Sequence, residues 1–125
     1  MMSMPGAAVR PRWPVPAQGC DCHIHLYDLD GYPLPQASPV SPPRATWNDY
    51  LALRANLGIA RCVIVQPMGY CFDNCCTLSA LRAAQGSARA IIAMPAQAQA
   101  VDLAQWRRPA WWARASRWCR TAAAC

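Results

Sequence analysis

The sequence predicts an α/β fold built on a parallel sheet, and two observations carry this prediction. Residues 61–66 and 89–94 form nearly continuous apolar runs rich in β-branched side chains, each followed by a proline. Such runs are typical of strands buried in a parallel sheet. Segments with helical spacing alternate with these runs, which favours right-handed crossover connections within one sheet.

The first strand is expected at residues 19–27, GCDCHIHLY, and is followed by a proline-rich loop at residues 28–43. A strand alternates its side chains between two faces. We therefore expect Asp21, His23 and His25 on one face, and the more apolar residues between and after them on the other.

The helices are predicted from their capping signals. Thr46 and Asp49 are spaced as a capping box before a helical pattern, and Gly58 stands where a glycine ends a helix. A second helix is expected over residues 77–84, with Asn74 or Thr77 as its cap, and a third over residues 96–105.

Composition divides the 125-residue chain into three parts, namely a flexible leader at residues 1–18, a body at 19–105 and an irregular tail at 106–125. The net charge is +6, but the tail alone carries five Arg and no acid. This Trp- and Arg-rich tail is what a GC-rich gene yields when read out of frame, so we expect a frameshift near residue 105, or a truncated or mis-called gene. No apolar stretch approaches the roughly 18 residues of a membrane span. The cytoplasm is the expected compartment, with the eight cysteines as reduced thiols.

His23 and His25 are the only histidines and carry the sharpest chemical signal. On a strand their Cβ atoms lie about 6–7 Å apart on one side. The two imidazoles can then converge on a divalent metal, which lowers the pKa of a bound water, or on a substrate carbonyl. A catalytic zinc takes three protein ligands, so two are too few. The alternative interpretation is that both rings merely pack or hydrogen-bond.

The segment DCHIHLYD, the proline-rich loop and TWNDYLALRANLGIARCVIVQPMGYCFDNCCTLSAL together resemble the start of the amidohydrolase-related family of TIM-barrel hydrolases. Within that family they are most similar to the 2-pyrone-4,6-dicarboxylate lactonase-like branch. The resemblance covers residues 19 to about 95. It implies a partial (β/α) TIM barrel comprising about the first three βα units, followed by the irregular Trp- and Arg-rich tail.

The resemblance also implies roles for individual residues. His23 and His25 would be catalytic residues and ligands of a divalent metal such as zinc, although the lactonase branch need not use one. Four residues after the second barrel strand would bind substrate, namely Gln66, Tyr70, Asp73 and Asn74. The later histidine and the last-strand aspartate of the family have no counterpart in this chain.

The implied function is that of the N-terminal portion of a hydrolase acting on a lactone, ester or amide by activated water, with a dicarboxylate lactone as a candidate. The 125-residue chain itself is expected to be inactive. A small-molecule substrate is the expected partner, whereas a membrane or a nucleic acid is not, and the oligomeric state stays open. One alternative is a non-functional truncated remnant, which predicts no cooperative unfolding. Another is a basic Cys/Arg/Trp-rich module that binds nucleic acid through residues 106–125.

Overall fold

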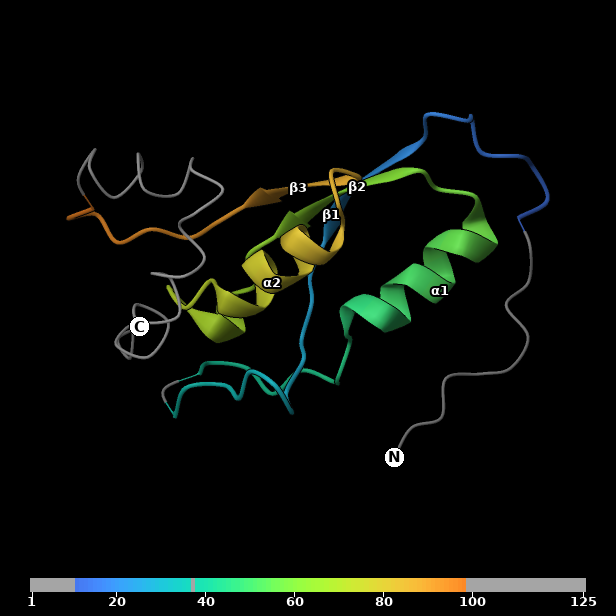
Figure 1. Cartoon of the computed structure of the whole chain (residues 1–125). Helices are drawn as coiled ribbons and strands as arrows, with labels where there is room; N and C mark the ends of the chain where they lie inside the picture. The colour runs from blue at the N-terminus through green and yellow to red at the C-terminus, as the bar shows by residue number, and fades with distance from the viewer. Residues whose placement is uncertain (1–10, 37, 99–125) are drawn as a thin grey trace.

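Strands and helices alternate along the chain in a computed structural model that describes residues 11–36 and 38–98 (Figure 1). The α/β order expected from the sequence is confirmed for these residues. The elements are β1 (Cys20–Ile24), α1 (Trp47–Leu57), β2 (Arg61–Val65), the short 3-10 helix η1 (Met68–Tyr70), α2 (Cys75–Ala83) and β3 (Ala88–Ile91).

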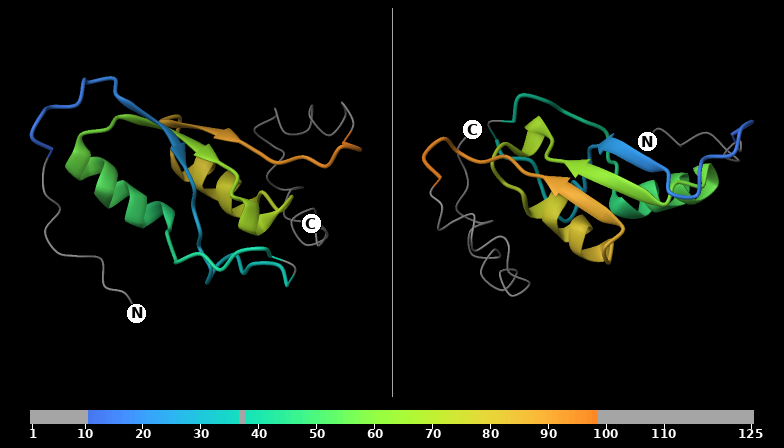
Figure 2. Two further views of the ribbon diagram at one scale, coloured as in Figure 1. Left: turned by 180° about the vertical axis from the view of Figure 1, so that it is seen from behind. Right: turned by 90° about the horizontal axis from the view of Figure 1, so that it is seen from above.

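The three strands form one parallel sheet in the order β1-β2-β3. Both helices lie on the same face of this sheet, and the opposite face is not covered by any element of the described chain (Figure 2). Because the strands are parallel, their carboxyl ends lie at the same end of the sheet, and the loops after β1, β2 and β3 start there.

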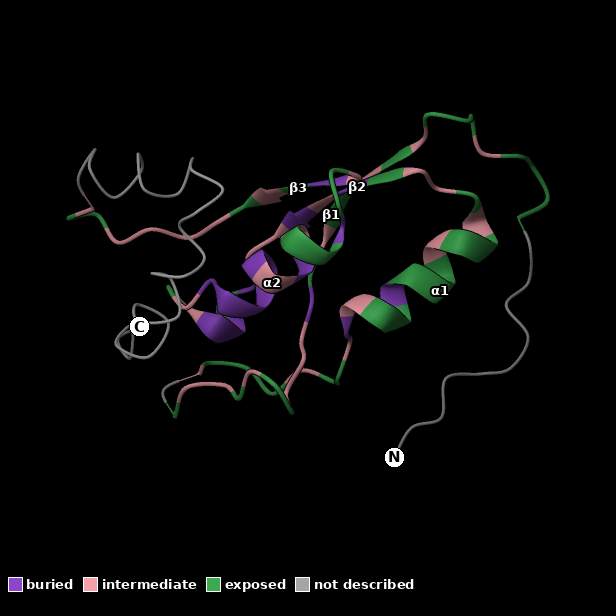
Figure 3. Ribbon diagram, in the orientation of Figure 1, coloured by how far each residue is buried: buried purple, intermediate pink, exposed green. Residues whose placement is uncertain are grey.

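The hydrophobic core lies between the sheet and the two helices. Ile64 of β2 is 0% exposed, and Leu26 and Tyr70 pack in the same cluster. Helix α2 is largely buried, whereas α1 exposes most of its surface and buries only Tyr50 fully (Figure 3). Burial of apolar surface therefore holds α2 to the sheet more firmly than α1.

Helix α1 begins and ends where its capping signals predict. The Thr46 hydroxyl accepts the Asp49 backbone N–H, and the Asp49 carboxylate accepts the Thr46 backbone N–H at 2.8 Å. Gly58 closes the helix with φ 71° and ψ 24°, a left-handed conformation that glycine adopts without a steric penalty. Helix α2 runs from Cys75 to Ala83, and Asn74, one of the two predicted caps, occupies its N-cap position; the helix therefore begins two residues before the predicted start at residue 77.

The remaining sequence predictions concern one segment that the structure describes fully and three that it describes in part or not at all. The strand expected at 89–94 runs from Ala88 to Ile91. Of the helix expected at 96–105, residues 96–98 form a turn closed by a 3.0 Å bond from the Ala98 N–H to the Pro95 carbonyl, and 99–105 lie outside the described residues. The first ten residues of the leader and the whole tail at 106–125 also lie outside them, so both remain predictions.

The cysteines differ in their state. Cys20, Cys22, Cys62 and Cys76 are free thiols, but Cys71 and Cys75 are disulfide-bonded. The expectation of reduced thiols throughout is therefore wrong for these two, because a compartment argument says nothing about which sulfurs the fold brings together. Within the described residues, no helix has the length and apolar character needed to cross a membrane.

Candidate active site

The two histidines meet at the carboxyl end of β1. The Nε2 atoms of His23 and His25 are 3.3 Å apart, and the rings stand edge to face with centroids 4.9 Å apart and planes at 88°. Both side chains are exposed. The expected approach of the two imidazoles is observed, and their Nε2 atoms lie within hydrogen-bonding distance of each other, as the alternative interpretation also predicts.

An irregularity in β1 determines which residues share a face with the imidazoles. Asp21 pairs with Cys62 and Ile24 pairs with Ile64, so three steps along β1 match two along β2. The extra residue reverses the alternation, as a β-bulge does. Asp21 and Ile24 therefore both turn toward the core side of the sheet.

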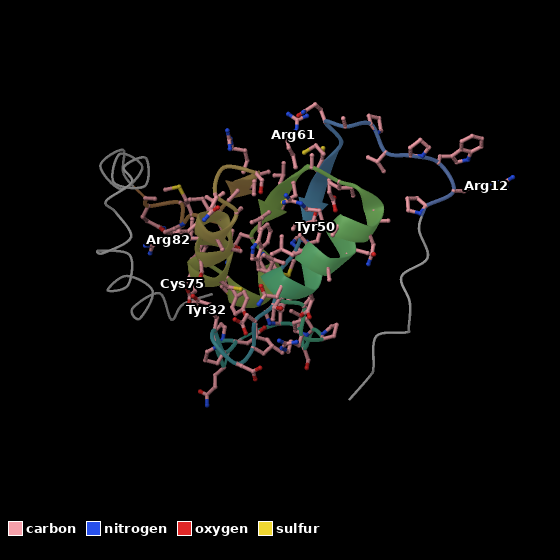
Figure 4. The ribbon with its side chains drawn as sticks, turned by 45° about the vertical axis from the view of Figure 1, so that its right-hand side comes forward. Arg12, Tyr32, Tyr50, Arg61, Cys75 and Arg82 are labelled. Carbon is pink, nitrogen blue, oxygen red and sulfur yellow. The ribbon has the colours of Figure 1, made fainter. Side chains whose placement is uncertain are left out.

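The prediction that Asp21 lies on the same face as the histidines is wrong for this reason. Its carboxylate instead accepts a hydrogen bond from the Tyr50 hydroxyl at 3.3 Å, and Tyr50 lies between α1 and the sheet (Figure 4). The other carboxylate oxygen accepts the His23 backbone N–H at 3.3 Å. Asp21 thus fixes the backbone that carries His23 and ties it to α1, without touching the ring.

The second histidine is oriented by the neighbouring strand. The Nδ1 atom of His25 lies 3.0 Å from the Val65 carbonyl oxygen at the end of β2. A carbonyl can only accept, so Nδ1 carries the proton and the Nε2 of a neutral His25 presents a lone pair. This is the tautomer required of an imidazole that binds a metal or accepts a proton through Nε2.

The imidazole pair fits two positions of a metal site. Two nitrogens about 2.0–2.1 Å from a tetrahedral zinc are separated by about 3.3–3.4 Å, and the observed Nε2–Nε2 distance is 3.3 Å. Within residues 11–36 and 38–98, no cluster of three or more His, Cys, Asp or Glu side chains could hold a metal ion. The described part therefore brings together two imidazole nitrogens, whereas a catalytic zinc site normally uses three protein ligands.

Gln66, directly after β2, uses its side-chain amide to hold the following loop. Its Nε2 donates to the carbonyls of Cys71 at 3.3 Å and Asp73 at 2.8 Å. Its Oε1 accepts the Thr77 hydroxyl at 2.6 Å. Thr77 is 0% exposed. The sequence predicts it as one of two candidate helix caps, whereas the structure shows its hydroxyl bonded to Gln66.

Asn74 plays a similar part at the start of α2. Its Nδ2 donates to the carbonyls of Phe72 at 3.0 Å and Ala93 at 2.8 Å, and its Oδ1 accepts the Ala93 N–H at 2.9 Å. The side chain thereby joins the loop after β2 to the segment after β3. It is 6% exposed and makes no capping bond to α2.

Tyr70 and Asp73 are the other two predicted substrate-binding residues. Tyr70 is 1% exposed and donates its hydroxyl to the Tyr32 carbonyl at 2.7 Å, which anchors the proline-rich loop. The pKa of Asp73 is raised, because burial disfavours the charged carboxylate. A 3.0 Å hydrogen bond from the Cys75 N–H to Oδ1 offsets only part of this effect. No hydrogen bond within the described chain joins the four predicted substrate-binding residues to the imidazoles.

The fold and the site define the class of the protein, an α/β protein whose adjacent strand ends carry an imidazole pair and a tightly bonded loop. A family comparison then places it: the chain belongs to the amidohydrolase family, whose profile matches residues 20–111. The resemblance stated from the DCHIH segment and the region around β2 is thereby confirmed.

The curated relatives and solved structures extend this result. The chain is 35% identical over 68 residues to a 4-sulfomuconolactone hydrolase of Rhizobium radiobacter, covering 54% of this chain and 23% of that protein. It is 32% identical over 82 residues to the 4-sulfomuconolactone hydrolase of Hydrogenophaga intermedia, covering 65% and 27%. The chain thus spans about a quarter of the length of these two relatives.

Two solved structures share the fold. A protein of Agrobacterium tumefaciens, crystallised in its apo form, aligns with a TM-score of 0.66 at 30% identity, over 76% of this chain and 35% of that one. A probable 2-pyrone-4,6-dicarboxylic acid hydrolase of Acinetobacter baumannii, crystallised with citric acid bound, aligns with a TM-score of 0.64 at 17% identity, over 70% and 33%. At that identity the second match supports the fold alone.

Proposed function

We propose that the chain forms the N-terminal part of a (β/α)-barrel hydrolase that opens lactones, and that His23 and His25 lie in its active site. The observation that carries the proposal is the convergence of the two Nε2 atoms, 3.3 Å apart, at the carboxyl end of a strand. Substrate sites of α/β proteins lie at such strand ends. The 4-sulfomuconolactone hydrolases supply the substrate class, a lactone that carries an anionic group.

The order of the sheet supports a barrel over an open, doubly wound sheet. A doubly wound sheet reverses its strand order and carries helices on both faces. Here the strands follow one another as β1-β2-β3, and α1 and α2 both lie on one face (Figure 2). In a barrel of this kind the helices form the outer ring, and the uncovered face of the sheet becomes the interior.

The imidazole pair suits hydrolysis of a lactone. Attack of a water oxygen on the carbonyl carbon breaks the ring C–O bond and leaves a carboxylate and a hydroxyl group. A divalent metal, when bound, would polarise the carbonyl and lower the pKa of that water. The Nε2 atoms of His23 and His25 would hold such a metal, His25 in the tautomer that leaves Nε2 unprotonated, and Asp21 fixes the His23 backbone from the opposite face.

The loop after β2 would form a wall of the substrate pocket. Gln66, Tyr70, Asp73 and Asn74 use their side chains mainly to fix the backbone of this loop. We assign them to the pocket as residues that set its shape. With two metal ligands in the described part, the 125-residue chain alone is expected to be inactive, and activity would require the remaining barrel strands.

A chimeric enzyme tests the proposal. This chain replaces the segment that it matches in the Rhizobium radiobacter 4-sulfomuconolactone hydrolase, and hydrolysis of 4-sulfomuconolactone is followed with and without added zinc. We expect hydrolysis by the chimera, and His23→Ala or His25→Ala should lower kcat/KM by about 10²-fold or more.

Cys22→Ser is the matched control, because Cys22 is exposed, adjoins His23 and bonds only within its own strand. It should leave kcat/KM within about threefold, since surface substitutions of this kind change little. A chimera that unfolds cooperatively but keeps full activity after both histidine substitutions would refute the role of the pair.

A further inference from the structure

Two exposed thiols lie on β1, just before the imidazole pair. Cys20 and Cys22 are both free and exposed, and they are separated by one residue of the strand. The Cys22 Sγ leans back along the strand to within 3.6 Å of the Cys20 carbonyl oxygen. Asp21 between them turns to Tyr50 on the core side. The two sulfurs therefore share the face of β1 that the helices leave uncovered.

These thiols differ from the other free cysteines of the described chain. Cys62 and Cys76 are 2% and 4% exposed and pack in the hydrophobic core. Neither core thiol can be reached by a reagent while the fold is intact. Cys20 and Cys22 are thus the only free thiols within residues 11–36 and 38–98 that solvent reaches as a pair.

The spacing of the pair selects what it can bind. Residues two apart on a regular strand place their Cβ atoms about 6–7 Å apart with parallel Cα–Cβ bonds, and Cys22 stands at the start of the irregular stretch between Asp21 and Ile24. A disulfide requires Cβ atoms about 3.5–4.5 Å apart, so direct oxidation of this pair would distort the strand. An atom inserted between the sulfurs removes that requirement, and thiol sulfurs prefer soft centres.

We propose that Cys20 and Cys22 form a dithiol site for a soft, thiophilic centre that bridges two sulfurs, with a trivalent arsenical as its ligand. A monosubstituted arsenical oxide condenses with both thiols. Two S–H bonds and the arsenic–oxygen bond break, two arsenic–sulfur bonds form, and the oxygen leaves as water with both protons. Arsenic stays trivalent throughout, so the step needs neither an oxidant nor a reductant.

The position of this site links it to the imidazole pair. The bridge would span Asp21, whose carboxylate accepts the His23 backbone N–H, and it would end at Cys22, next to His23. An occupied dithiol should therefore restrain the irregular part of β1 and change the surroundings of the His23 ring. The proposal does not depend on hydrolase activity and would stand if that activity were absent.

Phenylarsine oxide is the probe, applied to the purified full chain without a disulfide reductant, so that Cys71 and Cys75 stay disulfide-bonded. We expect one bridged adduct that survives excess glutathione, a monothiol, and is removed by a dithiol such as 2,3-dimercaptopropanol. Tryptic mapping should place it on residues 13–44, a peptide that contains Cys20 and Cys22 and no other cysteine. The His23 imidazole resonances should shift on binding.

Two comparisons make the test decisive. Cys20→Ser and Cys22→Ser should each lose the glutathione-resistant adduct on that peptide, while Cys76→Ser should keep it. A synthetic peptide of residues 13–44 should release arsenic to glutathione about tenfold more readily, because it lacks the folded strand. An adduct on another peptide, an adduct that a monothiol strips from the native chain, or equal retention by the synthetic peptide would overturn the proposal.

Discussion

The end of β1 and the loop after β2 follow adjacent parallel strands, yet they use their polar side chains in opposite ways. His23 and His25 are exposed, and their Nε2 atoms face each other. Gln66 and Asn74 direct every polar atom of their amides to the loop, to α2 or to the segment after β3. The first region leaves nitrogens available for chemistry, while the second uses its polar groups to hold a shape.

The difference follows from burial. A buried amide without partners costs about 1–3 kcal/mol, so a polar side chain placed in a tight loop must bond to the backbone around it. No buried side-chain nitrogen or oxygen among the described residues lacks a hydrogen-bond partner. An exposed imidazole has no such constraint, because water can satisfy it until a metal or a substrate takes its place.

The largest expected effect is a loss of stability from a substitution in the loop after β2, compared with a substitution at the end of β1. Asn74→Ala should lower the free energy of unfolding by about 2–3 kcal/mol, because it leaves the N–H and carbonyl of Ala93 without their partner. His25→Ala removes the contacts of an exposed side chain with the Val65 carbonyl and the His23 ring, and should cost less than about 1 kcal/mol. Urea unfolding of the full chain measures both values. A larger loss for His25→Ala would reverse the comparison.

The sequence predicted much of the fold because its signals are local. The capping box of Thr46 and Asp49 and the terminal Gly58 delimit α1 correctly, since each acts within a few residues. The face of Asp21 was wrong because the extra residue in β1 is set by pairing with β2, about 40 positions away. The alternation of residues within β1 alone does not reveal a bulge that depends on pairing with another strand.

The candidate site was predicted in the same uneven way. Two histidines at alternate strand positions suffice to predict that the rings approach each other. Two of the three hydrogen bonds of the Asn74 side chain go to Ala93, 19 residues ahead, in a segment with no polar side chain to mark it. Residue type therefore identified polar positions after β2, but only the three-dimensional contacts show that these side chains fix the backbone.

A moderate effect is expected at the contact between this loop and the proline-rich loop. Tyr70→Phe removes the 2.7 Å bond to the Tyr32 carbonyl and should lower the free energy of unfolding by about 1 kcal/mol. Limited proteolysis should then cut residues 28–43 faster. Tyr32→Phe is the matched control, because the Tyr32 carbonyl, which accepts the bond, remains. Equal proteolysis of the two variants would show that the hydroxyl of Tyr70 does not anchor the loop.

The smallest effect concerns Asp73, a half-buried carboxyl in the same loop. Burial raises its pKa above the ordinary value of 3.8, so the fold favours the protonated form. The free energy of unfolding should therefore fall as pH rises from about 3.8 through the raised pKa, by less than about 1 kcal/mol because solvent screens a half-exposed group. Asp73→Asn keeps an acceptor for the Cys75 N–H but does not titrate. The stability of Asp73→Asn relative to the unsubstituted chain should increase across this pH range and then stay level toward neutral pH. If the stability of Asp73→Asn relative to the unsubstituted chain stayed constant from pH 3 to 7, or declined, the fold would not disfavour the Asp73 carboxylate.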